Sequence, residues 1–243
     1  MPRANRYYIS GHIWHITHRC HKKEFLLKFK CDRERWLHWL FEAKKRFGLT
    51  ILNYIVTSNH IHLLVQDDTQ QAVSKSMQLI AGRTAQEFNR RKNRNGAFWE
   101  DRYHATAVDC KNYLIQCLAY IDLNMVRAGV VKHPSEWSQS GFNEIQSPPE
   151  RYQMIDQKKL CQLLGVNSKT KLRKHHLSWV EDALLQNQLS RDDKWTDSLA
   201  VGSQQFAENY LDLVGPRANN RQVKAVDDCY VVNEPNLAYS IDL

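Results

Sequence analysis

Hydrophobic and polar residues alternate with two different periods along the first half of the chain. Alternation at every second residue is typical of a half-buried strand, whereas apolar positions three to four residues apart are typical of a helix. The first period predicts strands over Tyr7–Arg19, Thr50–Val56, Asn59–Val65 and residues 103–109. The second period predicts helices over Asp32–Phe47, Ala72–Arg91 and Asn112–Ala128. Gly48 and Gly129 stand where glycine commonly ends a helix.

The order of these elements is strand, helix, strand, strand, helix, strand, helix. The short links favour an α+β fold, an antiparallel sheet with helices packed on it, and Thr57-Ser58 is the predicted hairpin turn. The prolines of the segment 147–150 mark a predicted boundary between a first domain, 1–146, and a mostly helical C-terminal extension, 147–243. Within the extension we expect helices over Gln157–Leu164, Ser178–Asn187 and Gln204–Leu213, and little regular structure from Pro216 onward.

Positive charge is concentrated in the first part of the chain. Residues 1–150 hold 22 lysines and arginines against 14 acidic residues, whereas residues 151–243 hold 12 of each, so the net charge of +8 lies entirely in the first part. A phosphate backbone selects such a surface, although a merely solubilising basic surface is the alternative. No apolar run approaches the roughly 20 residues of a membrane span. Six scattered cysteines without a Cys-x-x-Cys pair are typical of reduced thiols in the cytoplasm.

A basic run is followed at once by interleaved aromatic and basic residues. Aromatic faces stack on unpaired bases while arginine and lysine follow phosphates, so this region predicts binding of single-stranded nucleic acid. The candidate DNA-binding residues are Arg90, Arg91, Lys92, Arg94, Trp99, Arg102 and His104. A solvated helix end is the alternative for the basic run, and a core position is the alternative for Trp99. Single-stranded RNA would suit the same surface.

His60 and His62 stand two residues apart on a predicted strand, so both imidazoles project from one face. Two neutral imidazoles can hold a divalent metal, but the pair alone is better explained by packing or by a surface position. Tyr120 and Asn124 lie four residues apart on a predicted helix and share one of its faces. If that face meets the histidines, Asn124 would supply a third metal ligand and Tyr120 a nucleophile beside the metal.

Other histidines receive no such role from the sequence. His12, His15 and His18 recur every three residues on a strand and do not share one face, so we expect none of them to bind the metal. His175 and His176 follow a lysine-rich stretch and are expected on the solvated surface, with DNA contact as the alternative.

Three motifs, taken together, resemble one family. Asn59-His60-Ile61-His62-Leu63-Leu64-Val65, then Trp99-x-x-Arg102-Tyr103, then Tyr120-Ile-x-x-Asn124-x-Val126-Arg127-Ala128-Gly129-Val130 resemble the REP-associated tyrosine transposases, relatives of the IS200-like single-tyrosine HUH transposases. The resemblance covers about residues 7 to 137. Many members have proline where this chain has Met125.

The resemblance implies a ferredoxin-like α+β fold, with His60, His62 and Asn124 as ligands of Mg²⁺ or Mn²⁺ and Tyr120 as the catalytic nucleophile. It also implies a transposase that cleaves and joins single-stranded DNA at REP-like hairpin repeats through a 5′-phosphotyrosine intermediate. A repeat-DNA-binding protein that cleaves little or not at all is the alternative function. A cytoplasmic, nucleoid-associated bacterial protein is expected, acting as a monomer, with a dimer as the alternative.

Overall fold

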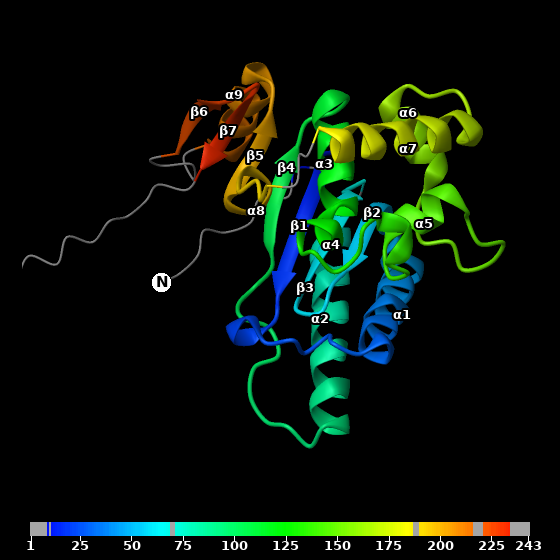
Figure 1. Ribbon diagram of the computed structural model, residues 1–243. Helices are drawn as coiled ribbons and strands as arrows, with labels where there is room; N and C mark the ends of the chain where they lie inside the picture. The colour runs from blue at the N-terminus through cyan, green and yellow to red at the C-terminus, as the bar shows by residue number, and fades with distance from the viewer. Residues whose placement is uncertain (1–8, 10, 69–70, 187–189, 216–220, 234–243) are drawn as a thin grey trace, which may run out of the picture.

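The computed structural model describes residues 9, 11–68, 71–186, 190–215 and 221–233 (Figure 1). Over these residues one seven-stranded sheet runs in the order β2-β3-β1-β4-β5-β7-β6. Its strands are β1 (Ile13–Arg19), β2 (Thr50–Val56), β3 (His60–Gln66), β4 (His104–Val108), β5 (Ser198–Gly202), β6 (Gln222–Val226) and β7 (Cys229–Asn233). The α-helices are α1 (Lys30–Phe47), α2 (Ala72–Arg91), α3 (Asn112–Asp122), α4 (Asn124–Arg127), α5 (Gly141–Gln146), α6 (Gln157–Leu164), α7 (Lys169–Leu185), α8 (Lys194–Asp197) and α9 (Gln204–Val214), with short 3₁₀ turns at His21–Lys23 and Pro134–Glu136.

The first four strands and two helices follow the connection β1-α1-β2-β3-α2-β4, and every neighbouring pair of these strands is antiparallel. Their spatial order, β4-β1-β3-β2, is that of the ferredoxin-like fold. The predicted α+β fold is therefore confirmed, and the strand that carries His60 and His62 lies inside the sheet. In the part of the chain that the structure describes, no helix is long and apolar enough to cross a membrane.

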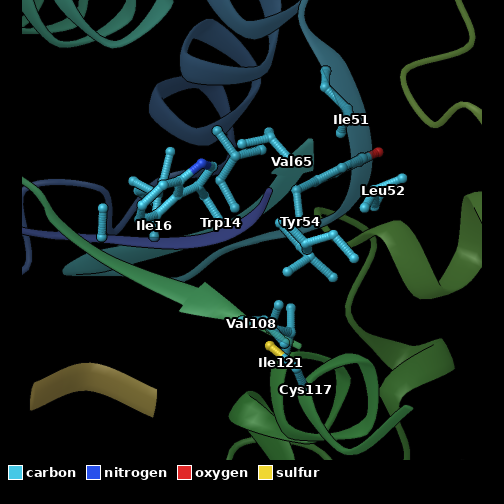
Figure 2. Packing of buried hydrophobic residues seen from close by; sticks show 14 of the residues in the cluster. Trp14, Ile16, Ile51, Leu52, Tyr54, Val65, Val108, Cys117 and Ile121 are labelled. Atoms are coloured by element: carbon cyan, nitrogen blue, oxygen red, sulfur yellow. The ribbon is translucent and has the colours of Figure 1, made fainter. Parts of the chain in front are cut away.

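The two faces of the central strands serve different purposes. Alternation along β1 sends the fully or nearly fully buried side chains of Trp14 and Ile16 to the face covered by α1 and α2. The opposite face receives α3, whose Cys117 and Ile121 lie beside Val108 of β4 (Figure 2). Burial of these apolar groups on both faces stabilises the sheet at roughly 25 cal/mol per Å² of apolar surface removed from water. The α3 face is also the one on which β1 presents His15 and β3 presents His60 and His62.

The helix predicted over Asn112–Ala128 is interrupted. The helix α3 ends at Asp122, and α4 begins at Asn124 after Leu123, whose ψ of 1° departs from helical geometry. The guanidinium of Arg127 donates a hydrogen bond to the Tyr120 carbonyl across this break. The break occurs with methionine at position 125, so proline is not needed to produce it.

The C-terminal extension contains the three predicted helices and three strands that were not predicted. The helix α7 begins at Lys169, nine residues before the expected start at Ser178. The side chain of Ser168 caps this start. The first turns lack an apolar stripe, so the hydrophobic pattern did not reveal them. Asn187, its expected end, lies outside the described residues. The strand β5 pairs in parallel with β4, and β6 and β7 extend the sheet beyond it. The sheet thus continues past the division predicted at residue 146, which stays a prediction.

Candidate active site

The hairpin between β2 and β3 fixes the first histidine of the pair. Thr57 Oγ1 donates to the main-chain carbonyl of His60 at 2.8 Å and accepts from its main-chain N–H at 3.1 Å. The Nδ1 atom of His60 lies 2.7 Å from Asn59 Oδ1, which can only accept, so the proton of a neutral ring stands on Nδ1. His62 follows on the same face of β3, with its ring centroid 5.0 Å from that of His60. The two histidines therefore share one face of the strand, as the His-x-His spacing predicted.

The helices α3 and α4 bring the other two predicted residues to this pair. The side-chain amide of Asn124 lies 2.9 Å from His62 Nε2. The Tyr120 ring meets the His62 ring edge to face, with centroids 5.7 Å apart and planes at 85°. Together with His60, these residues line one cavity of about 390 Å³. The structure therefore gathers His60, His62, Asn124 and Tyr120 in one place despite the break at Leu123.

Burial and neighbouring cations determine the protonation of the site. Burial, and then Arg19, lower the pKa of His60 from 6.5 to about 4. Burial, and then His60, lower the pKa of His62 well below its ordinary value. Both imidazoles are consequently neutral at physiological pH, the form in which imidazole ligates a metal. Burial also raises the pKa of Tyr120, so its phenol is protonated there, although nearby Arg127 opposes this shift.

The donor set suits a divalent cation. Nδ1 of His60 is occupied by Asn59, and Nε2 of His62 faces the side-chain amide of Asn124. Among the described residues no three His, Cys, Asp or Glu side chains form a metal-binding group. Beside His62, the side-chain amide of Asn124 offers a third donor group. Because amide O and N are assigned from hydrogen bonding, the Asn124 side chain can present its oxygen instead of its nitrogen. Two imidazoles and one amide oxygen are ligands that manganese or magnesium accepts.

Arginines also line the cavity beside these ligands. The guanidinium of Arg127 lies over the Tyr120 ring, 4.1 Å from its centroid. Arg19, Arg102 and Arg191 line the same cavity, which also has three acidic lining residues, Glu100, Asp101 and Asp197. Guanidinium groups at this position can pair with a phosphate, since their planar donors match phosphate oxygens.

The predicted DNA-binding residues divide into two groups. Arg102 and His104 line the cavity, and His104 Nε2 donates to the Ser198 carbonyl at 2.8 Å. The basic run at the end of α2 and Trp99 lie outside the cavity lining. Contact of these residues with DNA stays a prediction.

The basic run is partly engaged with the protein itself. Arg91 forms an ion pair with the buried Asp32, and Arg94 donates to the Ala97 carbonyl at 3.0 Å. Arg90 and Lys92 are exposed. Trp99 is half-buried, and its indole N–H donates to the Ala81 carbonyl on α2 at 3.0 Å. A packing role for Trp99, the alternative left open by the sequence, has this direct support.

Several site residues were not predicted. His15 contacts His62, Arg19 ends β1, and Arg191 and Trp195 belong to the C-terminal extension. Arg127 stands in the third sequence motif and could have been chosen from it, but nothing in the spacing links Arg191 or Trp195 to residues 60–62.

The expectation that His176 lies on the solvated surface is wrong. It is fully buried, and its Nε2 lies 2.7 Å from a carboxylate oxygen of Asp122 at the end of α3. Asn53 Nδ2 donates to the other oxygen of the same carboxylate at 3.0 Å. Only one narrow face of α7 is directed toward α3, and His176 lies on that face. The neighbouring lysines lie on the other faces, so the local sequence suggested a solvated position.

One protein family and two solved structures are similar to part of this chain. No curated protein shows significant similarity to the chain. A solved structure of a REP-associated tyrosine transposase bound to a REP hairpin is 22% identical, with 59% of this chain and 84% of that chain covered and a TM-score of 0.48. A candidate transposase from Deinococcus radiodurans R1 is 17% identical, with coverages of 49% and 95% and a TM-score of 0.35. Residues 8–124, which include all four residues of the candidate site, match the family described as "Transposase IS200 like". This region of the chain therefore belongs to the IS200-like transposase family.

Proposed function

We propose that the chain is a metal-dependent single-stranded DNA endonuclease and strand-transferase that acts on REP-like hairpin repeats through a 5′-phosphotyrosine intermediate. The convergence of His60, His62, Asn124 and Tyr120 in one arginine-lined cavity carries the proposal. A protein that only bound repeat DNA would need none of the four in this arrangement. Monomeric action in the bacterial cytoplasm, at the nucleoid, is part of the same proposal.

The chemistry follows from the protonation of these residues. A divalent metal held by His60, His62 and Asn124 would supply charge stabilisation at the scissile phosphate. The phenolic oxygen of Tyr120 forms a bond to phosphorus while the bond from phosphorus to the 3′ oxygen breaks. The phenol releases its proton, and the departing 3′ oxygen takes one up as a hydroxyl group. Attack by another 3′-hydroxyl on the phosphotyrosine reverses these changes and joins a new strand.

The arginines support the same reaction from the protein side. Arg127, held over the Tyr120 ring and bonded to its main-chain carbonyl, fixes the approach of the phenol. Positive charge from Arg19 and Arg191 acts on His60 and favours an incoming phosphate. The cavity thereby combines an oriented nucleophile with a site for the anion that it attacks.

The test is a covalent adduct. Full-length protein is incubated with Mn²⁺ and hairpin-forming single strands taken from the DNA that flanks its gene, and adducts are resolved on a denaturing gel. We expect an adduct with the wild type, none with Tyr120→Phe, and hairpin binding by that variant within about twofold, since only the attacking oxygen is removed. His62→Ala should abolish metal-dependent cleavage.

Tyr113→Phe is a matched control. Tyr113 lies two turns earlier on α3 and outside the cavity lining, so its replacement should leave the adduct unchanged. An adduct that persists in Tyr120→Phe would exclude Tyr120 as the nucleophile. Tight hairpin binding by the wild type without any adduct would instead support the DNA-binding alternative.

A further inference from the structure

A chain of hydrogen bonds connects His62 to a main-chain carbonyl of the C-terminal extension. Nδ1 of His62 lies 2.9 Å from Nε2 of His15, and Nδ1 of His15 lies 2.9 Å from the carbonyl oxygen of Trp195. The two imidazoles are nearly parallel, with planes 7° apart. Both rings are buried, and His15 has no exposed surface. At the other end of this series of hydrogen bonds, Nε2 of His62 faces Asn124 and the cavity.

The direction of these hydrogen bonds follows from the carbonyl at one end. A carbonyl oxygen can only accept, so Nδ1 of His15 carries the proton. A neutral imidazole has one N–H, and burial favours the neutral form, so Nε2 of His15 is an acceptor. Nδ1 of His62 must then donate to it, and Nε2 of His62 is left without a proton. That nitrogen is the one available to a metal.

The two histidines of the pair are thus fixed in different ways. His60 is oriented by Asn59 and Thr57 in its own hairpin. His62 depends on a residue of β1 and on a carbonyl 133 positions further along the chain than itself. Histidine ligands commonly donate their second ring N–H to such a partner, which sets their orientation and basicity.

Thr106 ties the segment that carries the Trp195 carbonyl to β4. Thr106 of β4 donates its hydroxyl to the Ser198 carbonyl at 2.7 Å and approaches the Trp195 carbonyl at 3.3 Å. The Trp195 side chain is buried, with its ring centroid 6.1 Å from that of Tyr120. These contacts dock the segment 195–198 onto the site.

We propose that His15 and the Trp195 carbonyl form a positioning relay that holds His62 in its metal-ligating tautomer, so that the C-terminal extension completes a site whose ligands lie in residues 8–124. The effect of the relay on metal binding rests on the proposed function, but the hydrogen bonds of the relay can be tested separately. His15 is a positioning residue, since it does not line the cavity.

The first measurement reads the tautomers directly. Long-range ¹H–¹⁵N spectra of the full-length, metal-free wild type should show His15 and His62 with the proton on Nδ1. In His15→Phe, which keeps a ring of similar size, the His62 signals should lose this single pattern and become a mixture of tautomers. A wild-type His62 protonated on Nε2 would overturn the proposal, whatever the protein's activity.

The second measurement is Mn²⁺ affinity, obtained by calorimetry. His15→Phe should bind Mn²⁺ about 10- to 100-fold more weakly, as expected when the partner of a ligating histidine is removed. His15→Gln places an acceptor oxygen near the position of the ring Nε2 and should recover part of the affinity. His12→Phe is the control, because His12 packs against Phe206 outside the cavity and its replacement should leave the affinity unchanged.

Wild-type affinity in His15→Phe would refute the relay. If the wild type itself binds no Mn²⁺, the proposed function fails, whereas the tautomer measurement still decides the relay.

Discussion

Replacement of His15 should change how the stability of the protein depends on pH. Burial lowers the pKa of His15 from 6.5 to about 3. Above pH 6.5 the folded and unfolded states are both neutral at this residue, so His15 contributes no pH dependence there. As the pH falls below 6.5, the unfolded chain binds a proton that the folded protein excludes, and the folded state loses stability.

The magnitude follows from the size of this difference. At pH 5 the pH lies about 1.5 units below the pKa of His15 in the unfolded chain. Each unit is worth about 1.36 kcal/mol, so His15 lowers the free energy of unfolding by about 2 kcal/mol at this pH. His60 and His62 add to this destabilisation in the wild type, since burial lowers their pKa values also. The contribution of His15 is therefore the difference between wild type and variant.

Urea unfolding of wild type, His15→Phe and His15→Gln at about pH 7.5 and about pH 5 measures this difference. Both variants should be destabilised by about 2 kcal/mol less than the wild type between the two pH values, because neither side chain can take up a proton. The glutamine variant separates this effect from ring packing. An identical destabilisation of all three proteins would show that His15 is not held neutral in the folded state.

Three further outcomes are expected. His176→Phe should lower the free energy of unfolding by about 3 kcal/mol in urea denaturation, because the buried side chain of Asp122 loses a hydrogen-bond partner. A change below about 1 kcal/mol would show that the pair is not structural. Arg191→Ala should reduce the slope of log K against log salt for single-stranded DNA by about 0.7, the value for one phosphate, in fluorescence anisotropy titrations; an unaltered slope would place the phosphate elsewhere. Simultaneous replacement of the basic run, Arg90, Arg91, Lys92 and Arg94, should weaken binding and reduce the same slope by about 0.7 for each phosphate that the protein no longer binds. Retention of the wild-type slope would show that the DNA does not pass over these residues.

The sequence by itself determined the local features of the central fold. The alternation in β1, β2 and β3 and the apolar stripes of α1 and α2 depend on neighbours within a few residues, so periodicity revealed them. The same locality put His60 and His62 on one face, and the family motifs added Tyr120 and Asn124. The helix break at Leu123 was not visible in this pattern, because the spacing of four residues reads alike in one helix or in two short ones.

Only the tertiary structure decided what surrounds these four residues. His15 was set aside because it shares no face with His12 or His18, yet the antiparallel register of β1 and β3 places it on the face of His62. The Trp195 carbonyl has no signature in sequence, since every residue has a carbonyl and only the docking of β5 beside β4 selects this one. Burial of His176 likewise depends on α7 meeting α3. Interactions between segments far apart in the chain follow from packing of whole elements, and spacing along the sequence does not record them.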